Sequence, residues 1–309
     1  MSIGFYQHSS VARDHLTHLL EHLGARVTPL DRCDHFVALD TESISEEDKL
    51  RAKYWIKAGK FDALISTDGD GDRPLLGDEK GNWIRGDILG LLTAKSLKAK
   101  HLVTPINANS DINETRFIQV LKTKIGSPFV IEGLEKIKQE VNQHQAVGFE
   151  ANGGFLLASN WEVNGKTLVQ LATRDSYLPL LSALFQCANS GQPISHRVNH
   201  LVSRYTASNS TKTRSSELNQ AFIETISQSK KLQKQLIQAL YPAKDDIILN
   251  KVNRLDGFRM TLSNQDIIHI RASGNSPELR CYAESQLTQL SENLVTNTLE
   301  WLRLNTMKE

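Results

Sequence analysis

The sequence predicts two α/β domains with mixed, mainly parallel sheets, followed by a C-terminal α+β domain with an antiparallel sheet. Strand-like and helix-like stretches alternate over residues 1–83 and again over 84–192, the pattern of parallel strands joined by right-handed helical crossovers. Gly191-Gln192-Pro193 looks like a linker. Over residues 193–309 several strand-like stretches follow one another without helices between them, which indicates an antiparallel sheet.

The first domain is expected to contain three strands with two helices between them. The strands are predicted at 3–6, 25–30 and 61–65, and the first helix at 11–23 with Gly24 as its C-cap. Ser45 and Asp48 form a capping box for the second helix, which ends at Gly59. The third strand runs directly into an acidic stretch, and ligands of parallel sheets bind at such carboxyl ends.

The other two domains are expected to follow in the same way. In the second domain, Ser127 as N-cap and Pro128 as the first helical residue begin a helix that runs to Val141. Its remaining elements are a helix at 88–97 opened by Asp87, strands at 101–105, 146–149 and 155–158, a strand or short helix at 117–121, and a helix at 177–187. The third domain is predicted to hold a helix at 218–240, strands at 247–249, 258–262, 267–270 and 279–282, and a closing helix at 285–304.

Composition excludes several classes of protein. A net charge of +1 gives no sign of a nucleic-acid partner, and no apolar stretch is long enough to span a membrane. The N-terminus has no basic region or long apolar run of a signal peptide. Three cysteines far apart in the sequence, Cys33, Cys187 and Cys281, fit a reducing cytoplasm. We therefore expect a cytoplasmic protein with neither nucleic acid nor membrane as partner.

The acidic stretch places Asp68, Asp70 and Asp72 at alternate positions with glycines between them. Three such charges repel one another unless a cation lies among them, and hard carboxylate oxygens suit Mg²⁺ or Ca²⁺. A solvated acidic turn is the alternative. An EF-hand is excluded because Arg73 stands at its glycine position and a strand precedes the loop. Arg73 could pair with an anion that the metal also contacts.

Two further loops suggest ligand binding only in combination. Residues 271–280 hold Gly274, small polar residues and two arginines, which suits an anion but also an ordinary polar connection. Glu150 lies in a Glu-Ala-Asn-Gly-Gly loop after a strand, where it could accept hydrogen bonds from sugar hydroxyls or be a solvated turn residue.

The three loops in this order resemble those of the α-D-phosphohexomutase superfamily, the phosphomannomutases and phosphoglucomutases. Asp68-Gly69-Asp70-Gly71-Asp72-Arg73 looks like its metal-binding loop, residues 148–154 like its sugar-binding loop, and residues 271–277 like its phosphate-binding loop. Lesser similarities are Lys124-Ile125-Gly126-Ser127-Pro128, Thr173-Arg174-Asp175 and Leu255-Asp256-Gly257-Phe258-Arg259.

The resemblance implies a role for each loop. Mg²⁺ would be held by Asp68, Asp70 and Asp72, with Arg73 beside the transferred phosphate. The substrate, a mannose or glucose 1- or 6-phosphate, would be bound by Glu150, Asn152, Arg174, Arg271, Ser273, Gly274, Asn275 and Arg280. The family reaction is a Mg²⁺-dependent phosphoryl transfer between C1 and C6 of the hexose.

Two departures from the family pattern matter. Gly154 stands where many bacterial members have histidine. The family's first domain carries a phosphorylated serine in a Thr-Ala-Ser-His-Asn-Pro loop, and this domain is expected to be lacking. Thr206-Ala207-Ser208 lacks the His and Pro of that loop and is expected to be a connection.

Two hypotheses follow from the missing serine. In the first, mutase activity needs a first domain supplied by a separate chain or a longer gene product. In the second, the chain is a non-catalytic sugar-phosphate-binding or regulatory protein. Self-association through residues 1–83 is expected in either case, and the sequence does not separate mannose from glucose.

Overall fold

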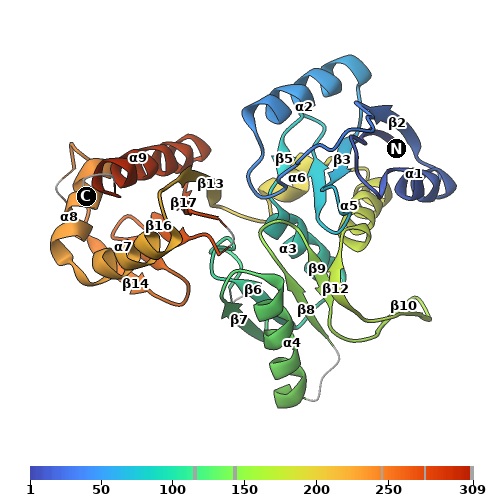
Figure 1. The fold of residues 1–309 in the computed structure, drawn as a ribbon. Helices are drawn as coiled ribbons and strands as arrows, with labels where there is room; N and C mark the ends of the chain where they lie inside the picture. Colours follow the sequence, from blue (N-terminus) through green and yellow to red (C-terminus); the bar gives the residue numbers. More distant parts are fainter. Residues whose placement is uncertain (114–116, 142–144, 245, 275, 307–309) are drawn as a thin grey trace. The chain divides into compact units, whose positions relative to one another are not determined.

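The structure, a computed structural model, describes residues 1–113, 117–141, 145–244, 246–274 and 276–306 (Figure 1). These residues divide into two compact units, Met1–Val202 and Ser203–Glu309. The predicted fold class is confirmed, since mixed sheets precede a C-terminal antiparallel sheet. The predicted division into three domains stays a prediction.

The first unit begins with a five-stranded sheet in the order β2-β1-β3-β4-β5. Its elements are β1 (Ser2–Tyr6), α1 (Arg13–His22), β2 (Arg26–Leu30), α2 (Glu46–Gly59), β3 (Ala63–Thr67), β4 (Pro74–Gly77) and β5 (Trp83–Ile84). Strand β1 pairs in parallel with β2 and β3, whereas β4 is antiparallel to β3. The predicted N-cap of α2 is confirmed, because Ser45 Oγ accepts a hydrogen bond from the Asp48 N–H.

The second sheet of this unit has the order β12-β9-β8-β6-β7. The elements are α3 (Gly86–Ser96), β6 (His101–Pro105), β7 (Gln119–Thr123), α4 (Ser127–Val141), β8 (Ala146–Phe149), β9 (Phe155–Leu157), β10 (Trp161–Val163), β11 (Lys166–Leu168), β12 (Leu171–Asp175), α5 (Tyr177–Ser190) and α6 (Ile194–Asn199). Strand β6 is parallel to β7 and β8, while β9 is antiparallel to β8. The sequence pattern did not predict β10, β11 or β12.

One hydrophobic core joins the two sheets of the first unit. It contains Phe5 of the first sheet, Leu89 of α3 and Phe149 of the second sheet. Helix α3 is buried from Gly86 to Ala94 and contacts both β4 and β8. A helix that is apolar all round lies inside a core, so α3 holds the sheets together. Helix α6 also belongs here, through Ile194, so Gly191–Pro193 lies within the unit.

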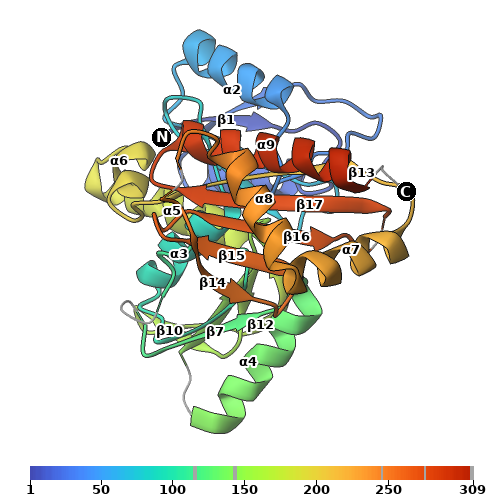
Figure 2. The ribbon, with the colours of Figure 1, turned by 90° about the vertical axis from the view of Figure 1, so that its left-hand side faces the viewer.

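The second unit is one antiparallel sheet with helices on one face (Figure 2). Its elements are β13 (Tyr205–Lys212), α7 (Ser216–Gln228), α8 (Lys230–Leu240), β14 (Leu249–Asn253), β15 (Phe258–Leu262), β16 (Ile267–Ala272), β17 (Glu278–Ser285) and α9 (Thr288–Thr306), and the strand order is β13-β17-β16-β15-β14. Its core contains Phe258, Ile268 and Leu294.

Three predictions for this unit are corrected. The single helix expected at 218–240 is two helices, because Ser229 is extended at φ −89° and ψ 99° and its Oγ caps α8 by accepting from Leu232 N–H. Ser208 lies in strand β13, paired with β17, instead of in a connection. The strand expected at 247–249 begins at Leu249.

No helix within the described ranges is long and apolar enough to cross a bilayer.

Candidate functional site

The acidic loop joins β3 to β4 at the carboxyl end of β3, and hydrogen bonds between Asp68 and residues 72 and 73 connect the two ends of the loop. Asp68 Oδ1 accepts hydrogen bonds from the backbone N–H groups of Asp72 and Arg73, both at 3.2 Å. The Asp68 N–H also donates to the Arg73 carbonyl at 3.1 Å. Burial raises the pKa of the Asp68 carboxyl, and the charge of Asp72 adds to that rise.

Two arginines lie close to the carboxylates of the acidic loop. Asp72 Oδ2 lies 2.8 Å from Arg174 Nη2, and Arg73 Nε lies 3.6 Å from Asp68 Oδ2. Asp70 is exposed. Over the described ranges, no three acidic, imidazole or thiol side chains are gathered so that they could hold a metal ion. The predicted metal site therefore stays a prediction. Its donor chemistry fits Mg²⁺: among the described residues Asp72 Oδ1 is buried without a hydrogen-bond partner, and Arg73 Nε lies 3.8 Å from it as an ion pair.

The sugar loop follows β8 and is folded tightly on itself. The Glu150 N–H donates to the Gly154 carbonyl at 3.1 Å, and the Gly154 N–H donates to Asn152 Oδ1 at 3.0 Å. The Glu150 side chain is only 3% exposed, and its Oε2 has no hydrogen-bond partner within the described part of the chain. Burial raises the pKa of this carboxyl, and the charge of Arg174 partly opposes the rise.

The structure brings the acidic and sugar loops together. Gly153 has φ +94°, and a Cβ there would lie 2.9 Å from the Pro74 carbonyl oxygen, so only glycine fits this close approach. Ser176 Oγ donates to the Gly71 carbonyl at 2.6 Å. Together with the pair formed by Arg174 and Asp72, these contacts fix the two loops at neighbouring positions.

The same packing explains the departure at Gly154. A Cβ at this position would lie 2.6 Å from Arg174 Cδ. The stem of Arg174 therefore occupies the space of a side chain at 154. Sequence reasoning missed Ser176, although it directly follows the Arg174-Asp175 pair that had been singled out.

The arginine loop of the second unit connects β16 to β17. Arg271 and Arg280 are directly opposite each other in the sheet, an arrangement that destabilises a sheet unless an anion compensates. Arg271 Nε lies 3.4 Å from Asp256 Oδ2. Ser273 is buried and accepts a hydrogen bond from Ser276 Oγ at 3.1 Å. A Cβ on Gly274 would meet open space, and Asn275 lies outside the described residues.

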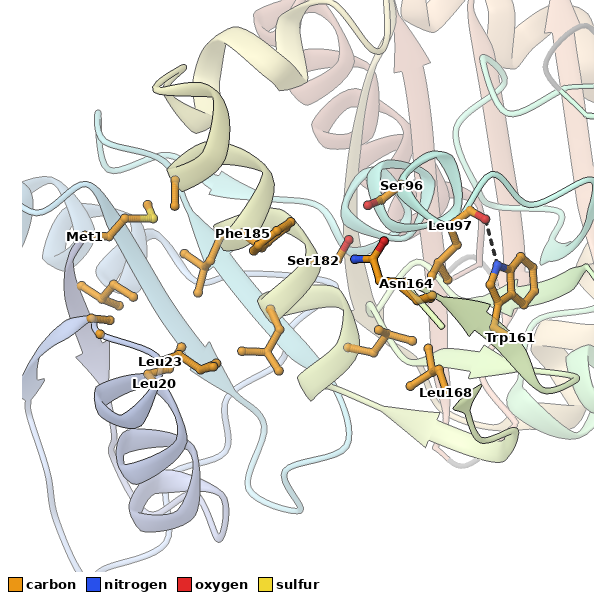
Figure 3. A pocket seen from close by; sticks show the side chains of 18 of the residues that line it. Met1, Leu20, Leu23, Ser96, Leu97, Trp161, Asn164, Leu168, Ser182 and Phe185 are labelled. Carbon is orange, nitrogen blue, oxygen red and sulfur yellow. Dashed lines mark hydrogen bonds between the residues drawn. The ribbon is translucent and has the colours of Figure 1, made fainter. Parts of the chain in front are cut away.

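A separate apolar cavity of about 810 Å³ lies in the first unit (Figure 3). Met1, Leu23, Leu97 and Phe185 are among its lining residues. Met1 precedes β1, so this cavity adjoins the amino end of that strand, whereas the acidic loop follows the carboxyl end of its neighbour β3. Its mainly apolar lining does not suit a phosphorylated sugar.

The fold defines a class of protein. The structure matches a phosphoglucomutase/phosphomannomutase family protein from Burkholderia thailandensis with a TM-score of 0.67 at 15% identity, over 100% of this chain and 61% of that one. It also matches Aspergillus fumigatus N-acetylphosphoglucosamine mutase in complex with GlcNAc-6P and magnesium, with a TM-score of 0.61 at 16% identity, over 98% and 61%. These likenesses show the fold of the phosphohexomutases.

Sequence comparison makes the assignment narrower. Residues 85–205 match the family model of phosphoglucomutase/phosphomannomutase, alpha/beta/alpha domain III. The chain is 44% identical over 303 residues to a phosphomannomutase of Salmonella muenchen, covering 96% of this chain and 60% of that protein. The chain is thus a homologue of the phosphomannomutases within the α-D-phosphohexomutase superfamily, and it spans about 60% of the length of this relative.

Proposed function

We propose that this chain binds hexose phosphates as part of a phosphomannomutase-like phosphoryl transfer. The observation that carries the proposal is the buried Glu150 Oε2, which has no partner among the described residues and lies in a loop packed against the acidic loop. A buried acceptor without a donor is costly, and a sugar hydroxyl supplies the missing donor.

Each loop has a separate role in the proposal. Glu150 and Asn152 accept hydrogen bonds from hydroxyl groups of the hexose. Arg73 and Arg174 place positive charge at the acidic loop, where a phosphoryl group can be bound. Arg271, Ser273, Gly274 and Arg280 bind phosphate in the second unit. Such catalysis consists mainly of positioning and electrostatic stabilisation.

Magnesium belongs to the proposal as the cofactor. Asp68, Asp70 and Asp72 would hold the ion, since carboxylate oxygens are its preferred protein ligands. When bound, Mg²⁺ would neutralise negative charge on the phosphoryl group. The Aspergillus neighbour, described in a complex with magnesium, supports this choice of metal.

The test is a binding and turnover assay on the chain. Mannose or glucose 1-phosphate is supplied with Mg²⁺ and hexose bisphosphate, and 6-phosphate formation is followed with and without an added first-domain fragment of a relative. We expect binding in both conditions and turnover with the fragment. Absence of turnover in both, together with measurable sugar-phosphate binding, would contradict the mutase and favour the non-catalytic binding protein. Loss of binding in Glu150→Gln tests the sugar loop.

A further inference from the structure

The segment between β2 and α2 contacts the sugar loop. Thr41 is 2% exposed, and its Oγ1 donates to the Asn152 carbonyl at 2.7 Å. The next residue, Glu42, accepts a hydrogen bond through Oε1 from Asn107 Nδ2 at 2.7 Å. A segment of the first sheet therefore contributes a carboxylate to the carboxyl edge of the second sheet.

Three side-chain acceptors converge at this edge. Asn107 and Glu150 follow the adjacent parallel strands β6 and β8, in which Val103 pairs with Gly148. Asn107 Oδ1 and Glu150 Oε2 are both buried and have no hydrogen-bond partner in the described ranges. The charge of Glu42 acts on Glu150 and adds to the burial that raises the pKa of the Glu150 carboxyl.

A cluster of acceptors requires a ligand with several donors. Leaving a buried acceptor unsatisfied costs about 1–3 kcal/mol, and a hexose offers several hydroxyl hydrogens on neighbouring carbons. Arg73 and Arg174, whose charges also act on Glu150, place positive charge near this edge that suits the phosphate of the same ligand.

We propose that Glu42 is a further hexose-binding residue, which accepts a hydrogen bond from a sugar hydroxyl beside Glu150. This inference rests on the proposed function of the sugar loop. Glu42 is only partly buried, so its carboxylate can reach a ligand. Its position is fixed on one side by Thr41 and on the other by Asn107.

The experiment measures the affinity of the full chain for three ligands by titration calorimetry. The probes are mannose 1-phosphate, glucose 1-phosphate and inorganic phosphate, and the variants are Glu42→Gln, Glu150→Gln and, as matched control, Glu47→Gln on the exposed face of α2. Glutamine keeps the shape and an acceptor at position 42, but it loses the stronger hydrogen bond of a charged group. Thermal unfolding confirms that each variant folds.

We expect Glu42→Gln to weaken the binding of both hexose phosphates about tenfold and to leave the binding of inorganic phosphate unchanged. The control variant should bind all three probes with the affinity of the wild type. Unchanged hexose-phosphate affinity in Glu42→Gln, with loss in Glu150→Gln, overturns the role of Glu42 alone. An equal loss for all three probes also overturns it, because the effect would then be general electrostatics. A wild-type chain that binds neither hexose phosphate overturns the proposed function as well.

Discussion

The acidic loop of the first unit and the arginine loop of the second concentrate opposite charges in different settings. The acidic loop ends a parallel strand, and its Asp68 and Asp72 are partly compensated by backbone N–H groups and Arg174. The arginine loop joins two antiparallel strands, where Arg271 directly opposes Arg280. In both places like charges are held together by backbone geometry, which is the reason for proposing a ligand of the opposite sign at each loop.

The comparison also shows where compensation comes from. In the first unit it comes from a distant segment, since Arg174 follows Asp72 by about a hundred residues. In the second unit it comes from the neighbouring turn, where Asp256 lies 3.4 Å from Arg271. The acidic loop therefore depends on tertiary packing more than the arginine loop does.

The largest expected effect is on the pH dependence of the second unit. Burial lowers the pKa of His269, beside the arginine loop in β16, to about 4 from its usual 6.5. Between pH 6.5 and 4 the unfolded chain binds a proton that the folded chain does not. The free energy of unfolding of the second unit is therefore highest above pH 6.5, and it falls by about 3 kcal/mol as the pH is lowered from 6.5 to 4.

Hydrogen exchange of β16 and β17 amides, compared with those of β1 and β3, measures this loss. His269→Gln should reduce the pH dependence of the second unit only. An equal slope in wild type and variant would show that His269 is not responsible.

The next effect concerns the arginine loop as an anion site. Arg280→Gln should weaken the binding of inorganic phosphate about thirtyfold, or about 2 kcal/mol, because a charge-assisted hydrogen bond is lost. Calorimetric titration measures the affinity. Arg303→Gln, an exposed arginine on α9, is the control and should behave as wild type; equal affinities in the Arg280 variant and wild type would remove the arginine loop from the proposal.

A smaller effect is expected where tertiary packing supports the sugar loop. Thr41→Val removes the donor to the Asn152 carbonyl and leaves that oxygen without its hydrogen bond. The local opening free energy of residues 150–154 should fall by about 1.5 kcal/mol, measured by amide exchange. Thr296→Val on α9, where the hydroxyl bonds within the helix, should leave the loop unchanged. Equal protection in both variants would argue against support by Thr41.

The smallest effect tests compensation of the acidic loop. Arg174→Met removes the partner of Asp72, so Mg²⁺ affinity should rise about twofold, or about 0.5 kcal/mol, because this ion pair is partly exposed. Calorimetric titration with Mg²⁺ is the measurement, and Arg51→Met, which removes a surface pair with Glu47, is the control. Weaker Mg²⁺ binding in Arg174→Met would mean that Arg174 supports the cation instead of competing with it.

Local patterns in the sequence determined most of the elements and the three loops. The N-cap at Ser45, strand β6 and strand β8 follow from capping chemistry and short-range apolar patterns, which neighbouring residues alone decide. The acidic loop was visible for the same reason, since its three aspartates lie within five residues. The family resemblance rested on such contiguous motifs.

Only the tertiary structure decided how distant segments meet. Ser229 divides a continuous helical pattern because its side chain caps the second helix. Helix α3 joins two sheets that the sequence separates at residue 83, since burial on all its sides needs both of them. Three contacts join residues that lie far apart in the chain: Arg174 pairs with Asp72, Thr41 donates to the Asn152 carbonyl, and Glu42 accepts from Asn107. No local pattern specifies such contacts, because packing and charge compensation act through space.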